Sequence, residues 1–198
     1  MFERQAQAGT PRLVLEKDYG LSYLLAGIAA VPRLYGVALF KGGTSLRKAY
    51  FPDYRFSEDL DYTLQRPLSP AELLALLSEA AQRATELLNE RGDFALEVRA
   101  VRHREEHERG QREFKVDVRF PWMRRASCAL KIEILSAPPE VIVGAPQERD
   151  LLHGFPETLS AKVRCYPLEE IAAEKLRGFL QTGRRFDELR GRRTRFRH

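Results

Sequence analysis

A strand, a glycine-rich turn and a helix follow one another directly near the start of the chain, and this order constrains the fold most. The apolar run at residues 36–40 predicts a buried strand, and residues 46–50 predict a helix. The segment Lys41-Gly42-Gly43-Thr44-Ser45 connects them. Glycines at such a junction let the backbone approach a phosphate, and the amides that begin a helix favour an anion. An ordinary tight turn has the same composition, so the turn alone leaves both interpretations open.

A second strand, predicted at residues 56–64, carries two aspartates. Because side chains alternate along a strand, Ser57, Asp59 and Asp61 would share one face. Neighbouring carboxylates repel each other, and Mg²⁺ or Mn²⁺ would keep both ionised while binding substrate phosphate oxygens. A solvated strand face is the alternative, since this short spacing is common. A glycine turn followed closely by a carboxylate pair is much rarer than either part, and it favours a nucleotide site.

Helices are expected in three further places. Apolar residues at helical spacing predict a helix at residues 15–31, which Pro32 would stop. Ser69 and Glu72 form a capping box that begins a helix continuing to residue 89. A third helix is expected at residues 168–181.

Strand patterns complete an α+β fold with a mixed sheet flanked by helices. Alternating segments at residues 94–101, 114–120 and 129–135 predict antiparallel neighbours in the sheet. A proline-rich loop and a connector without regular structure are expected to follow. We therefore expect a core over residues 1–150 and a helical C-terminal segment with a basic tail over residues 151–198.

Composition and charge are those of a soluble enzyme, and we expect a cytoplasmic protein without a membrane span. The two cysteines, Cys128 and Cys165, have no disulfide or metal-site spacing and are expected in the core. The formal net charge of +5 comes from residues 184–198, where seven arginines accompany two acids. Such a cluster suits RNA phosphates, whereas residues 1–183 are formally neutral.

Five segments carry a family pattern that covers most of residues 13–181. They are Glu16-Lys17-Asp18-Tyr19, Phe40-Lys41-Gly42-Gly43-Thr44-Ser45-Leu46-Arg47-Lys48, Arg55-Phe56-Ser57-Glu58-Asp59-Leu60-Asp61-Tyr62, Leu130-Lys131-Ile132-Glu133-Ile134 and Glu169-Glu170-Ile171-Ala172-Ala173-Glu174-Lys175-Leu176-Arg177. In these segments the chain resembles the AbiEii/AbiGii-type toxins, which are nucleotidyltransferases of the DNA polymerase β-like superfamily.

The resemblance implies a nucleotidyltransferase-type sheet and an Mg²⁺-dependent reaction on a nucleoside triphosphate (NTP). Asp59 and Asp61 would be catalytic and hold the metal. The segment Lys41-Gly42-Gly43-Thr44-Ser45 and Ser57 would bind the nucleotide. The acceptor would be an RNA, tRNA included, and a separately encoded antitoxin would neutralise the protein.

Two further catalytic candidates follow from the resemblance. The superfamily usually has a third acid on a neighbouring strand. Glu133 matches the family pattern better than Asp117, although either could be an ordinary polar strand residue. Lys175 shares a helical stripe with apolar residues and would therefore face inward, where it would neutralise the triphosphate. The alternative is a lysine whose stem packs while its ammonium reaches water.

The resemblance weakens toward the C-terminus. Family members are commonly longer and continue through an Arg-Asp-x-x-Asp-Leu-like motif, which residues 184–189 only approximate. We therefore expect a truncated C-terminal helical part. Residues 103–107 also fit the zinc-ligand pattern HxxEH, but they lie in a charged segment that favours a solvated loop.

Three functions remain open at this point. The first is transfer of a nucleoside monophosphate from NTP to an acceptor hydroxyl, with pyrophosphate leaving. The second is a catalytically degenerate module that binds nucleotide or RNA. The third is nucleotidyl transfer to a protein.

Overall fold

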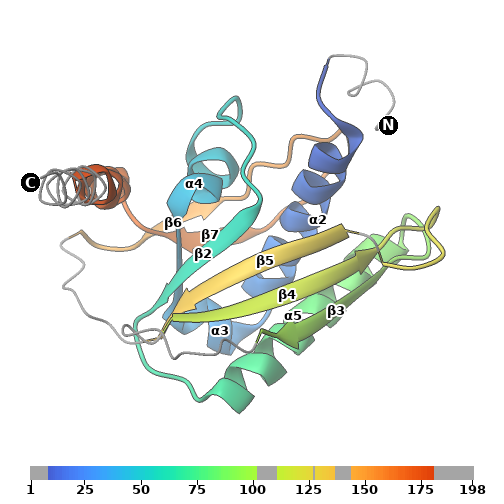
Figure 1. Ribbon diagram of the computed structural model, residues 1–198, viewed down its shortest axis with the longest axis horizontal. Helices are drawn as coiled ribbons and strands as arrows, with labels where there is room; N and C mark the ends of the chain where they lie inside the picture. Colours follow the sequence, from blue (N-terminus) through green and yellow to red (C-terminus); the bar gives the residue numbers. More distant parts are fainter. Residues whose placement is uncertain (1–8, 102–110, 127, 137–143, 181–198) are drawn as a thin grey trace, which may run out of the picture.

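A seven-stranded mixed sheet organises the molecule, which we describe from a computed structural model covering residues 9–101, 111–126, 128–136 and 144–180. The strands lie in the order β3-β4-β5-β2-β1-β7-β6 (Figure 1). Their bounds are β1 Ala38–Lys41, β2 Asp59–Leu64, β3 Ala95–Ala100, β4 Gln111–Arg119, β5 Cys128–Leu135, β6 Gln147–Asp150 and β7 Lys162–Cys165. This arrangement confirms the α+β class.

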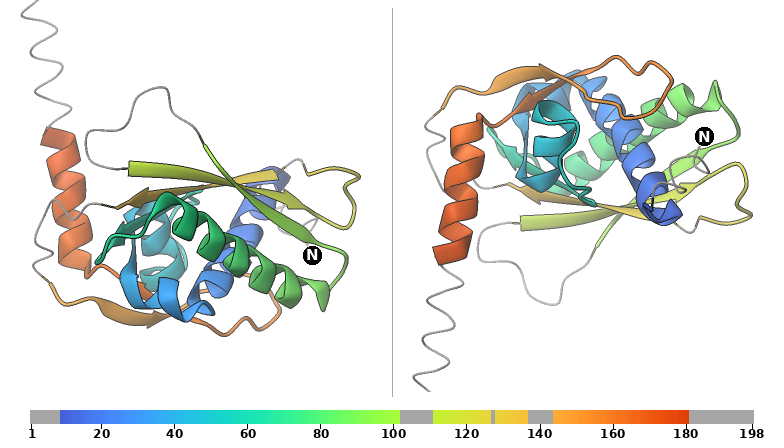
Figure 2. Two further views of the ribbon diagram at one scale, coloured as in Figure 1. Left: turned by 90° about the horizontal axis from the view of Figure 1, so that it is seen from below. Right: turned by 90° about the horizontal axis from the view of Figure 1, so that it is seen from above.

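Helices pack against one face of this sheet. They are α2 Arg12–Ala29, α3 Pro32–Val37, the single turn α4 Gly42–Ser45, the π-helix η1 Leu46–Tyr50 and α5 Pro70–Asn89. Helix α5 begins with the expected capping box, in which the Glu72 amide donates to Ser69 Oγ at 3.3 Å. The chain is helical again at residues 168–180, and this helix stands to one side of the sheet (Figure 2).

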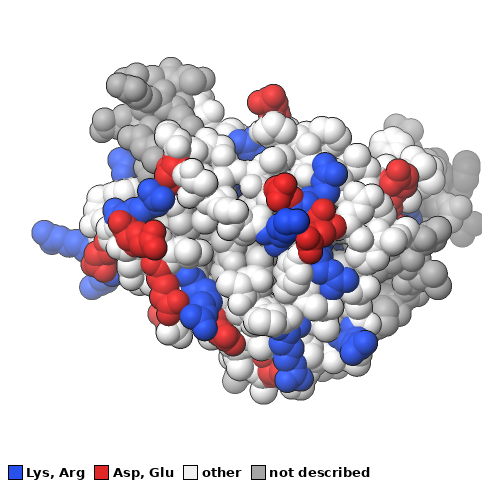
Figure 3. Space-filling model, turned by 180° about the vertical axis from the view of Figure 1, so that it is seen from behind, with Lys and Arg blue, Asp and Glu red and all other residues white. Residues whose placement is uncertain are grey.

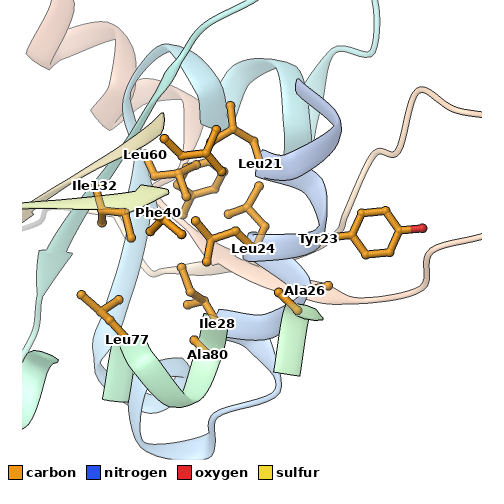
Figure 4. Close-up of a cluster of buried hydrophobic side chains, with 14 of the residues drawn as sticks. Leu21, Tyr23, Leu24, Ala26, Ile28, Phe40, Leu60, Leu77, Ala80 and Ile132 are labelled. Atoms are coloured by element: carbon orange, nitrogen blue, oxygen red, sulfur yellow. The ribbon is translucent and has the colours of Figure 1, made fainter. Parts of the chain in front are cut away.

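The two faces of the sheet differ because apolar and polar residues alternate along its strands. On β5, Leu130, Ile132 and Ile134 are buried, whereas Lys131 and Glu133 are only partly buried. The apolar face packs on α2 and α5, with Leu24, Ile28, Phe40, Leu60, Leu77 and Ile132 meeting between the layers (Figure 4). The opposite face is largely polar and holds the candidate site, and a small second cluster of Leu39, Leu46, Tyr166 and Ile171 covers it at β1.

Strand pairing brings distant segments together around β2. Strand β1 pairs with β2 in antiparallel register, with Lys41 opposite Asp61. Strand β5 pairs with β2 in parallel register, with Glu133 opposite Asp61 on the other side. The expected antiparallel pairing of β3, β4 and β5 is confirmed. Asp61 is thus flanked by a lysine and a glutamate from neighbouring strands.

The region around Pro32 differs from the sequence prediction. Helix α2 ends at Ala29, and Pro32 begins α3 instead of only stopping the helix before it. Proline suits a first helical turn, because the amide it lacks would have no partner there. Gly36 and Val37 consequently belong to α3, and the strand predicted from residue 36 starts at Ala38.

The segment expected to be a connector contains two strands, β6 and β7, and that expectation was wrong. Strand β7 pairs in parallel with β1, where Cys165 lies opposite Phe40, and β6 pairs with β7 at the sheet edge. Leu151, Phe155 and Val163 join the main core. The sheet and its core therefore continue beyond residue 150, where we expected the helical segment to begin.

Other expectations concern cysteines, membrane spans and surface charge. Cys128 and Cys165 are buried free thiols, as expected, and burial raises the pKa of Cys128 to about 11. Among the described residues, the helices are all too short or too polar to cross a bilayer. On the face opposite that of Figure 1, basic and acidic side chains are interspersed (Figure 3). Among the described residues on that face, the basic side chains do not form a continuous surface.

Candidate functional site

Three carboxylates gather on the polar face where β2 and β5 run side by side. Asp59 lies opposite Lys131, and Asp61 lies opposite Glu133. Opposite residues on paired strands point to the same face, so these side chains form one cluster. Gln111 Nε2 donates to Glu133 Oε2 at 2.7 Å, and Lys131 forms an ion pair with the other oxygen of Glu133.

Burial and like charge perturb Asp61 within this cluster. Its pKa rises to about 6, first because its carboxylate is removed from water and then because Glu133 and Asp59 repel its negative charge. Lys41 and Lys131 oppose the rise but do not cancel it. Raised carboxyl pKa values are typical of sites that receive a cation or a proton, so Asp61 marks a candidate functional site.

The glycine turn lies directly against Asp61. Gly42 has φ +78°, and a Cβ built on it would lie 2.0 Å from Asp61 Oδ2. Only glycine combines this backbone conformation with that approach at no steric cost. The turn and the aspartate strand, which the sequence analysis linked only by proximity in the chain, are therefore in contact.

The second glycine of the turn faces Ser57 and Arg55. A Cβ on Gly43 would lie 3.2 Å from Ser57 Oγ and 3.8 Å from a terminal nitrogen of Arg55. Ser57 lies before β2, which begins at Asp59, so the strand alternation predicted for Ser57 does not apply. The loop nevertheless brings Ser57 beside the turn. The sequence analysis missed Arg55 as a candidate, although it lies within the quoted family segment.

Thr44 and Ser45 support the turn instead of facing outward. Both residues have no exposed surface. The Thr44 hydroxyl donates to the carbonyl of Asp59, and the Ser45 hydroxyl donates to the carbonyl of Gly42 at 2.9 Å. The hydroxyls of Thr44 and Ser45 are therefore engaged within the protein, and the phosphate contacts expected for these two residues stay a prediction.

Lys41 lies between the aspartates and the last described helix. Its Nζ donates to Glu174 Oε1 at 2.7 Å and lies 5.4 Å from the centre of the Tyr166 ring. Both ends of this ion pair are partly buried, with 16% of the Lys41 side chain and 25% of the Glu174 side chain exposed. Lys41 is thus held beside the site by residues distant in sequence.

A buried ionic network fixes the element that follows the turn. Asp18 on α2 forms ion pairs with Lys48 Nζ at 2.8 Å and Arg47 Nε at 3.1 Å. Lys48 also donates to Ser22 Oγ at 2.8 Å. Burial lowers the pKa of Lys48, although Asp18 opposes the change. The family segments that contain Asp18, Arg47 and Lys48 therefore meet in space, a contact that sequence reasoning did not predict.

The two candidates for a third acid occupy different places. Glu133 lies opposite Asp61, as described above. Asp117 lies opposite Ala129, and its carboxylate accepts a hydrogen bond from Arg99 Nε at 2.7 Å. The arrangement is therefore compatible with a role for Glu133 at the aspartates and gives Asp117 a partner elsewhere on the face.

Lys175 does not face inward, contrary to expectation. Lys175 and Ala172 are exposed, and Phe179, from the same predicted stripe, is 75% exposed. Of that stripe, Ile171 is buried and packs with Leu39, Leu46 and Tyr166. The apolar spacing correctly predicted a helix. Among the described residues, however, none packs over the end of that helix near Phe179. Residues 103–107 and 184–198 lie outside the described parts of the chain.

The donor set at Asp59 and Asp61 suits a divalent cation shared with a substrate. Repulsion from neighbouring carboxylates, which raises the pKa of Asp61, is what such an ion would relieve. Within the described ranges, no three His, Cys, Asp or Glu side chains are grouped closely enough to form a metal site alone. Mg²⁺ commonly uses one or two carboxylates and takes its remaining ligands from phosphate and water.

Comparison with known proteins gives one family. The family model described as "Nucleotidyl transferase AbiEii toxin, Type IV TA system" matches residues 24–198. No curated protein matches the chain. The matched range includes the glycine turn, both aspartates and Glu133.

Proposed function

This chain belongs to the AbiEii family of nucleotidyl transferase toxins, and from that premise we propose that it transfers a nucleoside monophosphate from NTP to an RNA hydroxyl. One observation carries the chemistry: the carboxylate of Asp61 lies directly against Gly42. A phosphate chain that approached this turn would reach the carboxylates at once. Nucleotidyl transfer needs chiefly positioning and charge neutralisation, and this junction provides both.

Each side chain has a distinct proposed role. Asp59 and Asp61 would hold Mg²⁺, or Mn²⁺, and the ion would neutralise phosphate charge as pyrophosphate leaves. Gly42 and Gly43 leave room for the phosphates, and Lys41 balances their charge. Glu133 is proposed to accept the proton of the attacking hydroxyl at a carboxylate oxygen.

Acceptor and partner are proposed on separate grounds. An RNA acceptor, tRNA included, rests on the family resemblance and on the arginines of residues 184–198. The type IV toxin–antitoxin description supports a separately encoded antitoxin and action in the cytoplasm. Lys175 stays a candidate for triphosphate binding only if the helix at residues 168–180 turns toward the site, because the side chain is exposed.

Labelled NTPs test the proposal directly. Each NTP, labelled on its α-phosphate, is incubated with the protein, Mg²⁺ and total tRNA, and products are separated by electrophoresis. We expect label on RNA with the wild-type protein. In Asp59→Asn we expect the rate of label transfer to fall by about 100-fold or more. Asp117→Asn, which also removes a carboxylate from the polar face, is the matched control.

The other outcomes identify the alternatives. Label that migrates with polypeptide would indicate nucleotidyl transfer to protein. Absence of label with every NTP, together with retained RNA binding, would contradict the enzyme and favour a binding module.

A further inference from the structure

Among the described residues, Glu174 is the acid that forms an ion pair with Lys41, the lysine beside Gly42, although it comes from a helix outside the sheet. Lys41 lies opposite Asp61 in the β1–β2 register and next to the glycine turn in sequence. Glu174 reaches it from the helix at residues 168–180 with a 2.7 Å ion pair. The pair therefore lies at the point where a phosphate chain would enter.

From this arrangement we infer that Glu174 is an internal competitor of the substrate phosphates for Lys41. The inference rests on the proposed function, because it concerns the same nucleotide site. A carboxylate oxygen and a phosphate oxygen are both negatively charged hydrogen-bond acceptors, so either can accept a hydrogen bond from the Lys41 ammonium group. While Glu174 holds Lys41, the positive charge of the lysine is already balanced.

The negative charges around the site disfavour the binding of an anionic substrate. Asp59, Asp61 and Glu133 already place negative charge on this face, and their repulsion contributes to the raised pKa of Asp61. Glu174 adds another carboxylate beside them. An incoming triphosphate would meet that repulsion until Lys41 exchanged Glu174 for phosphate.

Geometry also explains how the exchange would occur. Lys41 is fixed at its backbone by β1 and beside the Tyr166 ring, which lies 5.4 Å from its Nζ. Glu174 lies on a helix whose outer residues Leu176, Phe179 and Leu180 are 57–75% exposed. Because Glu174 belongs to this helix and not to the sheet, Lys41 can exchange its acidic partner while β1 stays paired with β2 and β7.

Inorganic tripolyphosphate is the probe, because it carries the phosphate chain of any NTP without a base. Its affinity is measured by titration calorimetry at low salt, without divalent metal, for wild type, Glu174→Gln and Glu169→Gln. Glu169 lies on the same helix, is exposed and loses the same charge. We expect about three- to tenfold tighter binding in Glu174→Gln, and less than about twofold change in Glu169→Gln.

A double-mutant cycle separates competition for Lys41 from general charge removal. In a Lys41→Met background, Glu174→Gln is expected to change the affinity by less than about twofold. An equal gain with and without Lys41 would overturn the inference, as would equal or weaker binding in Glu174→Gln. Absence of binding in all variants would overturn it too.

The transfer assay, run on the same proteins, keeps the two proposals apart. If label still reaches RNA while Glu174→Gln binds tripolyphosphate like the wild type, only the competitor role fails. If Glu174→Gln binds more tightly but no protein transfers label, only the proposed reaction fails.

Discussion

Gly42 and Asp61 are in van der Waals contact across β1 and β2, and no other residue type fits at Gly42 without moving the carboxylate. A Cβ there would lie 2.0 Å from Oδ2. Gly42→Ala should therefore displace Asp61 and reduce nucleotidyl transfer by about 100-fold. Its cost to stability should be about 1–2 kcal/mol, because alanine must adopt φ +78°.

Activity and thermal unfolding, measured on the same samples, check this prediction. Gly36→Ala is the matched control, since a Cβ there meets no atom within 4 Å. A Gly42→Ala variant that transfers label at nearly the wild-type rate would show that the contact is not required.

Asp61 should make stability depend on pH in the metal-free protein. Its pKa is about 6 in the folded chain, against 3.8 when unperturbed, so the folded state binds the proton more tightly. The resulting stabilisation is complete below pH 3.8 and is lost as the pH rises through about 6. Asp61→Asn should thus be more stable than wild type at pH 7.5, by about 1–3 kcal/mol.

Urea unfolding with EDTA, repeated between pH 4 and pH 8, measures this difference. The advantage of Asp61→Asn should shrink toward zero at the acid end. Asp53→Asn, on an exposed turn, should show no such trend. A variant less stable than wild type at pH 7.5 would refute the electrostatic interpretation.

The Asp18 network should be far more costly to break than a surface ion pair. Asp18→Ala leaves Lys48 buried without its acidic partner and should destabilise the fold by about 3–5 kcal/mol. Glu58→Ala removes the neighbouring pair with Lys17, in which Glu58 is 52% exposed, and should cost less than about 1 kcal/mol.

Denaturant unfolding of both variants and of Asp18→Asn/Lys48→Met gives the comparison. The double variant should recover part of the lost stability, because the buried Lys48 ammonium is removed together with its acidic partner, while Arg47 keeps its hydrogen bond to the carbonyl of Pro52. Equal effects of Asp18→Ala and Glu58→Ala would contradict the role of burial.

Glu133 and Asp117 can be distinguished by kinetics. Glu133→Gln should lower the transfer rate by about 100-fold, because the carboxylate faces Asp61 and is proposed to accept the acceptor proton. Asp117→Asn should leave the rate within a few fold, since its partner is Arg99. A larger loss in Asp117→Asn than in Glu133→Gln would reverse the assignment.

Sequence reasoning succeeded where local patterns determine local structure. The alternation along β2 placed Asp59 and Asp61 on one face, and Ser69 and Glu72 fixed the start of α5. It failed for β6, whose four residues are all exposed and polar, because such a strand has no apolar signature. Strand β7 was missed for a related reason, since only four residues carry its pattern.

Tertiary contacts account for what the sequence could not predict. Apolar spacing correctly indicated a helix around Lys175, but the spacing does not tell which surface will cover each part of the stripe. Contacts such as Lys41 with Glu174 join elements that are distant along the chain. Only the assembled tertiary structure reveals them, and the same holds for Asp18 of α2 with Lys48 of η1.

The parallel pairing of β2 with β5 has a consequence for how the protein is made. Parallel neighbours need a long crossover, and here α5, β3 and β4 are synthesised between the strand of Asp61 and the strand of Glu133. Strand β7, which completes the other side of β1, is synthesised later still. A ribosome-bound chain therefore cannot assemble the three carboxylates early. In a cell that makes a toxin, this topology delays the appearance of the site until most of the polypeptide has emerged.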